Sequence, residues 1–319
     1  MSAPLPPPPP PPPPSPPLRG IYTPIPTFFK KDLVTIDFNS QVKHAKFLKE
    51  SGITGLVVMG STGENSHLTR QERFSIISKL HSELPDFTLI GGVAQNSVED
   101  ALDEIDSVKK AGAKYAVVLP SNYFGASIEQ DGIFDWYTEV ANKSSLPILI
   151  YVYPGVSNNI FIDPKTIKTL SYNPNIVGTK ISHGDVSHHT LIGLDEDIAN
   201  NNFSCFTGLG QILLPALVVG FKGTIDALSG ATPKIYIEIL NLYNKGELKN
   251  AAQLQLVATR GEELVVKFGV IGIKKAILAA TGIGETHLGR APLNQDISEA
   301  DWNQYSAHLS ELISIEMTL

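Results

Sequence analysis

The sequence predicts an α/β protein built as a (β/α)8 TIM barrel, with additional helices at its C-terminal end. Three observations lead to this fold class. Short apolar runs rich in β-branched residues alternate with stretches of helical periodicity. Eight such runs occur between residues 19 and 230. Their recurrence roughly every 30 residues matches one strand–helix unit of a parallel barrel.

The predicted strands begin after Arg19, and from the second strand onward consecutive strands start 20 to 34 residues apart. An open doubly wound sheet is the alternative, but its first strand would normally lead into a glycine-rich phosphate loop. Residues 29–32, which follow the first predicted strand, contain no glycine. The eight predicted strands, in chain order, are Ile21–Phe28, Ile53–Met59, Phe87–Val93, Tyr115–Leu119, Ile148–Tyr153, Ile176–Ile181, Phe203–Phe206 and Gly223–Ala227.

The stretches between the strands carry start and stop signals of helices. Thr69 and Glu72 have the spacing of a capping box, and Asp163 before Pro164 places an N-cap acid ahead of a first-turn proline. Gly112 stands where a helix should end, because glycine readily adopts the left-handed conformation of a C-terminal cap. After residue 230 the pattern is helical alone. The helices expected there include Pro233–Tyr243, Glu247–Thr259 and Glu262–Thr281.

The chain is expected to divide into three parts: an N-terminal arm of residues 1–18, a barrel of residues 19–230, and a helical region of residues 231–319 packed on the barrel. Residues 1–17 hold 12 of the 23 prolines. Such a segment favours polyproline II or a disordered arm. The arm is either a ligand for an adaptor domain of the SH3 or WW type, or a solvated tail.

Composition excludes several kinds of partner. The 25 basic and 32 acidic residues give a net charge of −7, and no basic block suggests a nucleic-acid partner. Cys205 is the single cysteine, which excludes an intrachain disulfide and a multi-cysteine metal site. No apolar run reaches the roughly 18 residues of a membrane helix, and the N-terminus lacks a signal or transit pattern. We therefore expect a cytoplasmic protein without a membrane partner.

Lys180 is the first candidate for chemistry, because it lies inside an apolar predicted strand. Strand alternation places Ile176, Gly178 and Lys180 on one face. Burying an ammonium is costly, so such a site favours the neutral amine, which can attack a ketone and form a Schiff base. Tyr151 precedes Lys180 by one strand–helix unit and should lie beside it, where a phenol can shuttle protons. The alternatives are a lysine that reaches water at the strand rim and a tyrosine that fills the barrel.

The loop after the second predicted strand, Gly60–Glu64, is the other candidate. Its glycines allow tight turns in which successive N–H groups can cradle an anion, and Ser61 and Thr62 add hydroxyl donors. A carboxylate-bearing substrate would fit this loop. An ordinary glycine-rich turn is the alternative.

Three motifs together give the chain a family resemblance. They are Gly60–Glu64, Tyr151–Gly155 and Val177–Lys180, which match the patterns G-x-x-G-E, Y-x-x-P-G and V-G-x-K. With Pro120 and Tyr123 after the fourth strand, residues 19 to about 310 resemble the dihydrodipicolinate synthase/N-acetylneuraminate lyase family. The resemblance implies a pyruvate-handling class I aldolase with a (β/α)8 barrel, a C-terminal helical region and a homo-oligomeric assembly, a dimer or a tetramer.

The same resemblance implies roles for individual residues. Lys180 is similar to the lysine that forms the Schiff base, and Tyr151 to the tyrosine that transfers protons. Ser61 and Thr62 are similar to the binders of the pyruvate carboxylate. Thr62 would join a hydroxyl relay with Tyr151, completed by a tyrosine of a neighbouring subunit, for which Tyr123 is the candidate.

Further positions concern the pocket and its departures from the family. Gly208 and Ile225 resemble residues that line the pocket from the last two strands. His183 stands where small residues are usual, and it either contacts an aldehyde hydroxyl or caps the next helix. True dihydrodipicolinate synthases carry an arginine after the tyrosine motif, whereas this chain has none between Arg73 and Arg260. A second substrate without a carboxylate is therefore favoured.

The function expected first is a class I aldolase that makes or cleaves a 2-keto-3-deoxy sugar acid from pyruvate and an aldehyde, with no metal or other cofactor. 4-Hydroxy-2-oxoglutarate aldolase and dihydrodipicolinate synthase are the alternatives within the family. Two alternatives belong to other classes. One is a metal-dependent aldolase using His183, Asp185, His188 and His189. The other is a non-catalytic scaffold with an adaptor-binding proline arm.

Overall fold

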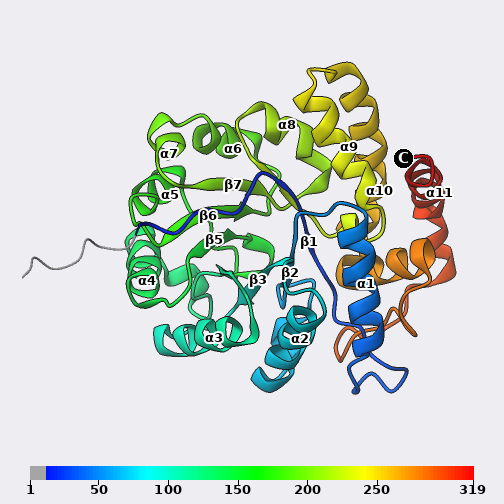
Figure 1. Ribbon diagram of the computed structural model, residues 1–319, viewed down its shortest axis with the longest axis horizontal. Helices are drawn as coiled ribbons and strands as arrows, with labels where there is room; N and C mark the ends of the chain where they lie inside the picture. The colour runs from blue at the N-terminus through cyan, green and yellow to red at the C-terminus, as the bar shows by residue number, and fades with distance from the viewer. Residues whose placement is uncertain (1–11) are drawn as a thin grey trace, which may run out of the picture.

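The protein is a closed barrel of eight parallel strands, each followed by helical structure, and the predicted fold class is confirmed (Figure 1). The computed structural model describes residues 12–319. Each strand pairs with the next in sequence, and β8 pairs with β1 to close the barrel. The strands are β1 (Gly20–Pro24), β2 (Gly55–Val58), β3 (Thr88–Val93), β4 (Tyr115–Val118), β5 (Ile148–Val152), β6 (Ile176–Ile181), β7 (Ser204–Thr207) and β8 (Gly223–Ile225).

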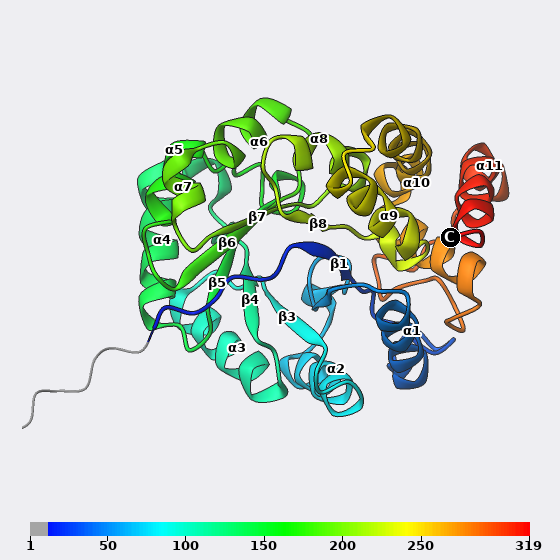
Figure 2. The ribbon, with the colours of Figure 1, turned by 45° about the horizontal axis from the view of Figure 1, so that its top comes forward.

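Helices surround the barrel on its outside (Figure 2). Several begin at the signals read in the sequence: Thr69 and Glu72 form both bonds of a capping box, and Gly112 ends its helix with a φ of 112°. Asp163 precedes Pro164 as expected, although its side chain forms no cap bond. The helices are α1 (Phe38–Glu50), α2 (Arg70–Glu83), α3 (Val98–Ala111), α4 (Gln130–Lys143), α5 (Pro164–Leu170), α6 (Val186–Gly193), α7 (Glu196–Asn200), α8 (Leu213–Val218), α9 (Pro233–Asn244), α10 (Leu248–Thr281) and α11 (Glu299–Glu316).

All eight expected strands are present, and their ends differ by a few residues. The largest difference is in β1, which ends at Pro24 rather than at Phe28. Pro26 lies just beyond that end, and a proline has no N–H with which to continue a ladder. The chain then turns away from the barrel, and Phe28 packs in the outer core instead.

The core has two layers. The outer layer lies between the strands and the helices, and the inner layer fills the barrel with side chains. The inner layer consists of Tyr22, Val57, Ile90, Val117, Leu119, Leu149, Tyr151, Val177, Phe206 and Ile225. Because the barrel is packed with these side chains, a substrate can enter only at one of its ends.

β6 contains a bulge that changes which of its side chains face inward. Its ladder with β5 shifts register, so that Ile176 and Gly178 take consecutive partners and Val177 is an extra residue. Val177 packs in the inner layer, whereas Ile176 packs in the outer layer. The expectation that Ile176 shares a face with Lys180 is therefore wrong, because simple alternation does not hold across a bulge.

The C-terminal helices differ from those expected. Glu247–Thr259 and Glu262–Thr281 were expected as separate helices, but α10 runs through both and is interrupted only at Gly269, whose φ and ψ are 53° and −135°. Gly261 lies within α10 where α11 packs closely; a Cβ on Gly261 would lie 1.7 Å from Leu312 of that helix. None of the helices named from the sequence lies at the position of α11. Figure 2 shows α9 and α10 on the side of the barrel where β1 and β8 meet, and α11 packs outside them.

Residues 12–18 lie across one end of the barrel before the chain enters β1 (Figure 1). Tyr115 Oη, at the start of β4, donates to the carbonyl of Ser15 at 3.0 Å. Ser204 Oγ, at the start of β7, donates to the carbonyl of Pro17 at 3.1 Å, and Pro17 is buried. This end is the N-terminal one. The rest of the predicted arm, and with it the predicted adaptor ligand, lies outside the described residues.

No helix among residues 12–319 is both long enough and apolar enough to cross a membrane.

Candidate active site

A cavity of about 700 Å³ opens at the C-terminal ends of the strands, which is the end of a TIM barrel that carries catalysis. Residues at the ends of β2 to β8 form its floor, and residues of α10 form one wall. The predicted site residues Ser61, Thr62, Tyr151, Lys180, Gly208 and Ile225 all line it. Tyr123 and His183 are not among its lining residues.

Lys180 of β6 lies beside Tyr151 of β5, because the two residues are paired in the register of the parallel ladder. The Nζ atom of Lys180 lies 4.3 Å from the centroid of the Tyr151 ring. Both side chains are 4% exposed. The prediction that one strand–helix unit of spacing places these two residues side by side is confirmed.

Gly208, after β7, leaves room for the lysine. A Cβ at this position would lie 3.1 Å from Cε of Lys180 and 1.8 Å from Oγ of Ser182. Gly178 shares the strand of Lys180 and was expected on the same face, but the structure gives it a contact with the next strand instead. A Cβ on Gly178 would lie 2.4 Å from the carbonyl oxygen of Ser204, so this glycine allows β7 to approach β6.

The loop Gly60–Glu64 forms a compact turn at the cavity. The N–H of Gly63 donates to the carbonyl of Gly60 at 3.0 Å, and the N–H of Glu64 donates to the carbonyl of Ser61 at 3.1 Å. Within the described part of the chain, the hydroxyls and N–H groups of Ser61 and Thr62 have no hydrogen-bond partner. These four donors line the cavity beside Lys180, which suits the binding of a carboxylate.

Glu64 anchors this loop to the C-terminal helices. Its Oε1 atom lies 3.1 Å from Nζ of Lys274 on α10, and both side chains are fully buried. Its Oε2 atom accepts the N–H of Arg290 at 3.1 Å. Burial lowers the pKa of Lys274, and the neighbouring Glu64 opposes that shift. The last position of the glycine-rich motif is thus a structural anchor.

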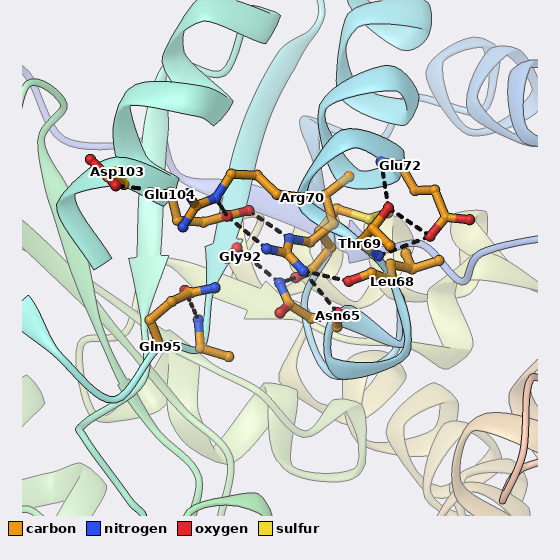
Figure 3. A network of polar contacts seen from close by, with 12 residues as sticks. Asn65, Leu68, Thr69, Arg70, Glu72, Gly92, Gln95, Asp103 and Glu104 are labelled. Atoms are coloured by element: carbon orange, nitrogen blue, oxygen red, sulfur yellow. Dashed lines mark hydrogen bonds and ion pairs between the residues drawn. The ribbon is translucent and has the colours of Figure 1, made fainter. Parts of the chain in front are cut away.

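A second polar network, around Asn65 and Glu104, lies next to this loop (Figure 3). Asn65 donates through Nδ2 to the carbonyls of Met59 at 2.7 Å and Gly92 at 3.2 Å, which ties the ends of β2 and β3 together. Arg73 of α2 pairs with the buried Glu104 of α3 at 2.6 Å. This ion pair therefore joins α2 to α3 next to the loop that carries the candidate anion donors.

Tyrosines flank the lysine on one side. Tyr153 lies two residues after Tyr151, lines the cavity, and has its ring centroid 5.8 Å from that of Tyr151. Burial, and then the neighbouring Tyr151, raise the pKa of Tyr153. Tyr123 instead is 76% exposed and lies outside the cavity, with its N–H bonded to Asn96 Oδ1 at 2.9 Å. The structure therefore does not bring Tyr123 together with Tyr151 and Lys180 within one copy of the chain.

Two carboxyl groups complete the wall, and sequence reasoning did not single out either. Asp226 follows β8, and Glu262 lies on α10; each is 2% exposed and each lines the cavity. Burial is the main cause that raises the pKa of both groups, and the pKa of Glu262 rises well above its ordinary value. An acid at the end of a barrel strand could have pointed to Asp226, whereas nothing local marks Glu262.

His183 belongs to a separate group of three imidazoles, His183, His188 and His189, called here the histidine cluster. Their ring nitrogens lie within 4.8 Å of one another, so the histidine cluster could hold a metal ion, but none of the three lines the cavity. Burial, and then the other two rings, lower the pKa of His183 to about 4. Asp185 caps α6 by accepting the N–H of His188 at 3.1 Å, so its carboxylate is engaged there.

The barrel and its cavity are typical of an enzyme, and the comparison with known families identifies the class of protein. The chain belongs to the dihydrodipicolinate synthetase family, whose model matches residues 17–312. The family identified from the three motifs is thus confirmed.

Named relatives and solved structures cover nearly the whole chain. A protein of Coccidioides immitis whose name contains 4-hydroxy-2-oxoglutarate aldolase, mitochondrial, is 34% identical over 95% of this chain and 98% of its own length. The L-threo-3-deoxy-hexylosonate aldolase of Hypocrea jecorina is 32% identical over 94% of this chain and 98% of its own. A crystal structure of a dihydrodipicolinate synthase family protein from Coccidioides immitis superposes with a TM-score of 0.85, at 31% identity, covering 96% and 99% of the two chains.

Proposed function

We propose that the protein is a class I aldolase in which Lys180 forms a Schiff base with pyruvate. The observation that carries this proposal is the buried lysine amine against the Tyr151 ring, in a cavity beside the donors of Ser61 and Thr62. The donors bind the pyruvate carboxylate and present the keto carbon to Lys180. Gly208 keeps the space in which the adduct forms.

The chemistry then follows from these groups. The neutral amine of Lys180 attacks the keto carbon, and the phenol of Tyr151 transfers the protons needed for one water to leave as the iminium forms. The iminium withdraws electrons, so the methyl carbon loses a proton and becomes an enamine. The enamine carbon bonds to the aldehyde carbon, whose oxygen takes up a proton. Water then hydrolyses the iminium and frees the lysine; cleavage is the reverse sequence.

The proposed second substrate is an uncharged polyhydroxy aldehyde, which makes the product a 2-keto-3-deoxy sugar acid. Among the described residues that line the cavity, Lys180 is the one lysine and none is an arginine. The name of the Hypocrea jecorina relative supports this choice. 4-Hydroxy-2-oxoglutarate aldolase is the second candidate, supported by the name of the Coccidioides immitis relative. Dihydrodipicolinate synthase comes third, because its second substrate carries a carboxylate.

Assembly and location belong to the same proposal. In a homo-oligomer, the exposed Tyr123 of one copy would reach the cavity of another and complete the relay of Thr62 and Tyr151. The expected cytoplasmic location competes with a mitochondrial one, since relatives from Coccidioides immitis and Emericella nidulans carry that word in their names. Imaging of a C-terminal fluorescent fusion against a mitochondrial marker distinguishes the two.

The test is chemical trapping. Incubation of the protein with pyruvate and borohydride should add one reduced pyruvyl group, and peptide mapping should place it on Lys180. Lys180→Ala should lose both the adduct and turnover, whereas Lys222→Ala, a matched variant of an exposed lysine, should keep both. An adduct on another residue, or full activity of Lys180→Ala, would overturn the mechanism. Pyruvate release from a panel of 2-keto-3-deoxy acids and from 4-hydroxy-2-oxoglutarate then ranks the substrates.

A further inference from the structure

We propose that Asp226 and Glu262 form a binding subsite for the second substrate, which accepts the hydroxyl groups of an uncharged aldehyde and excludes aldehydes that carry a carboxylate. The inference rests on the proposed aldolase function, because it concerns the same cavity. It adds that Asp226 and Glu262 determine the specificity for the aldehyde, and these residues belong to the wall formed by the end of β8 and by α10.

The first step of the argument is placement. Asp226 directly follows β8, and Glu262 comes from α10, so two distant segments bring their carboxyl groups to one point. That point is Gly210: a Cβ there would lie 2.5 Å from Oε1 of Glu262 and 2.7 Å from Cγ of Asp226. Both carboxyls line the cavity that also holds Lys180.

The second step is how rigidly the two groups are held. Asp226 accepts the N–H of Gly210 at 3.0 Å and the N–H of Ser229 at 2.9 Å. Glu262 accepts the hydroxyl of the buried Tyr236 at 2.5 Å. These bonds hold each carboxyl in a single orientation, so the subsite is preorganised for its ligand.

The third step is the charge of the pair. Burial raises the pKa of Glu262 further than that of Asp226, so a protonated Glu262 donates to the Asp226 carboxylate. The proposal therefore assigns the negative charge of the pair to Asp226 and the shared proton to Glu262. The neighbouring Lys180 opposes the rise in the pKa of Asp226, and within residues 12–319 neither carboxyl forms an ion pair with a lysine or an arginine.

The fourth step is what such a pair recognises. A carboxylate accepts hydrogen bonds from hydroxyl groups, and the bonds are stronger because one partner is charged. The carboxylate of glyoxylate or of a semialdehyde acid would instead face a buried like charge, which is strongly unfavourable. A structural role alone would not require acids here, since burying carboxyl groups that form no ion pair is costly. Acids in a reaction cavity with shifted pKa values are typical of functional groups.

The experiment compares two aldehydes. The rate of condensation with pyruvate is measured for glyceraldehyde, which is neutral, and for glyoxylate, which is anionic. The wild-type protein should show the higher kcat/KM with glyceraldehyde. Asp226→Asn removes the negative charge and should lower the ratio of the two kcat/KM values by about tenfold or more. Glu262→Gln keeps that charge and should change the ratio much less.

Glu263→Gln is the matched control, because it makes the same chemical change one residue along α10, where its side chain is 55% exposed. It should leave the ratio unchanged. Borohydride trapping of pyruvate on Lys180 is measured in every variant. If Asp226→Asn still traps pyruvate on Lys180 but its ratio of the two kcat/KM values is unchanged, the subsite proposal is wrong and the aldolase proposal is unaffected. Absence of trapping in the wild type would overturn the aldolase itself. Should Asp226→Asn fail to fold, a wild-type preference for glyoxylate still refutes the subsite.

Discussion

Replacement of Lys274 by methionine should strongly destabilise the protein, because it leaves the Glu64 carboxylate buried without its cation. Both side chains are fully buried, and Nζ lies 3.1 Å from Oε1. Removal of one partner of a buried ion pair costs about 3–5 kcal/mol of unfolding free energy. Glu64 keeps the N–H of Arg290 and the ring of His67 as partners, so we expect a cost near the lower end, about 3 kcal/mol.

A double-mutant cycle separates the pair from general damage to the core. Glu64→Gln removes the other charge, and the double variant Glu64→Gln/Lys274→Met leaves no unpaired charge. The double variant should therefore cost less than the sum of the two single variants, by about 1–3 kcal/mol. Lys267→Met, an exposed lysine on the same helix, is the control and should change stability by less than about 0.5 kcal/mol.

The assay is urea unfolding followed by tryptophan fluorescence, at one protein concentration because assembly contributes to apparent stability. Steady-state kinetics of the surviving fraction gives a second readout: the KM for pyruvate should rise in Lys274→Met, since Glu64 anchors the loop that carries Ser61 and Thr62. A cost below about 1 kcal/mol for Lys274→Met, or strictly additive single variants, would show that the pair does not hold this loop.

Three further results are expected. Gly208→Ala should slow borohydride trapping of pyruvate by about 100-fold or more while the protein stays folded, because the added Cβ meets Ser182 and Lys180; unchanged trapping would contradict the geometry. Burial raises the pKa of Glu262 in the folded protein well above its ordinary 4.5. The protonated Glu262 therefore stabilises the folded state fully below about pH 4.5, and this stabilisation is lost as the pH rises through the pKa of the folded protein. The stability of the wild type relative to Glu262→Gln should therefore fall on going from about pH 5 to about pH 9, and a flat difference would refute the assignment. Excess chelator should leave the aldol rate unchanged, because the histidine cluster lies outside the cavity; loss of activity would revive the metal-dependent alternative.

Much of the architecture and the centre of the site were predictable because they depend on local or evenly spaced patterns. Apolar runs and helix caps mark each unit, and a parallel barrel places equivalent positions of neighbouring units side by side. For that reason, the spacing of Tyr151 and Lys180 predicted their contact, and the loop after β2 predicted the free donors of Ser61 and Thr62.

Other features depend on segments that meet only after folding. Glu262 reaches Asp226 because α10 packs back over the barrel mouth, and no local pattern reports where a helix far along the chain will lie. The close approach of α11 to α10 at Gly261 is likewise a contact between separate helices. The bulge in β6 is an adjustment of one strand to its neighbour, which periodicity within that strand cannot show.

The proline-rich start of the chain also has one feature that its composition predicted and one that depends on tertiary contacts. Its composition predicted an extended segment, because proline restricts the backbone and removes hydrogen-bond donors. That residues 12–18 cross the N-terminal end of the barrel depends on Tyr115 and Ser204, which only the closed barrel brings within reach of the carbonyls of Ser15 and Pro17. Local chemistry thus specified the strands, the caps and the contact of Tyr151 with Lys180. The closing of the barrel and the return of α10 decided which distant side chains share the cavity, because those contacts come from packing between segments far apart in the chain.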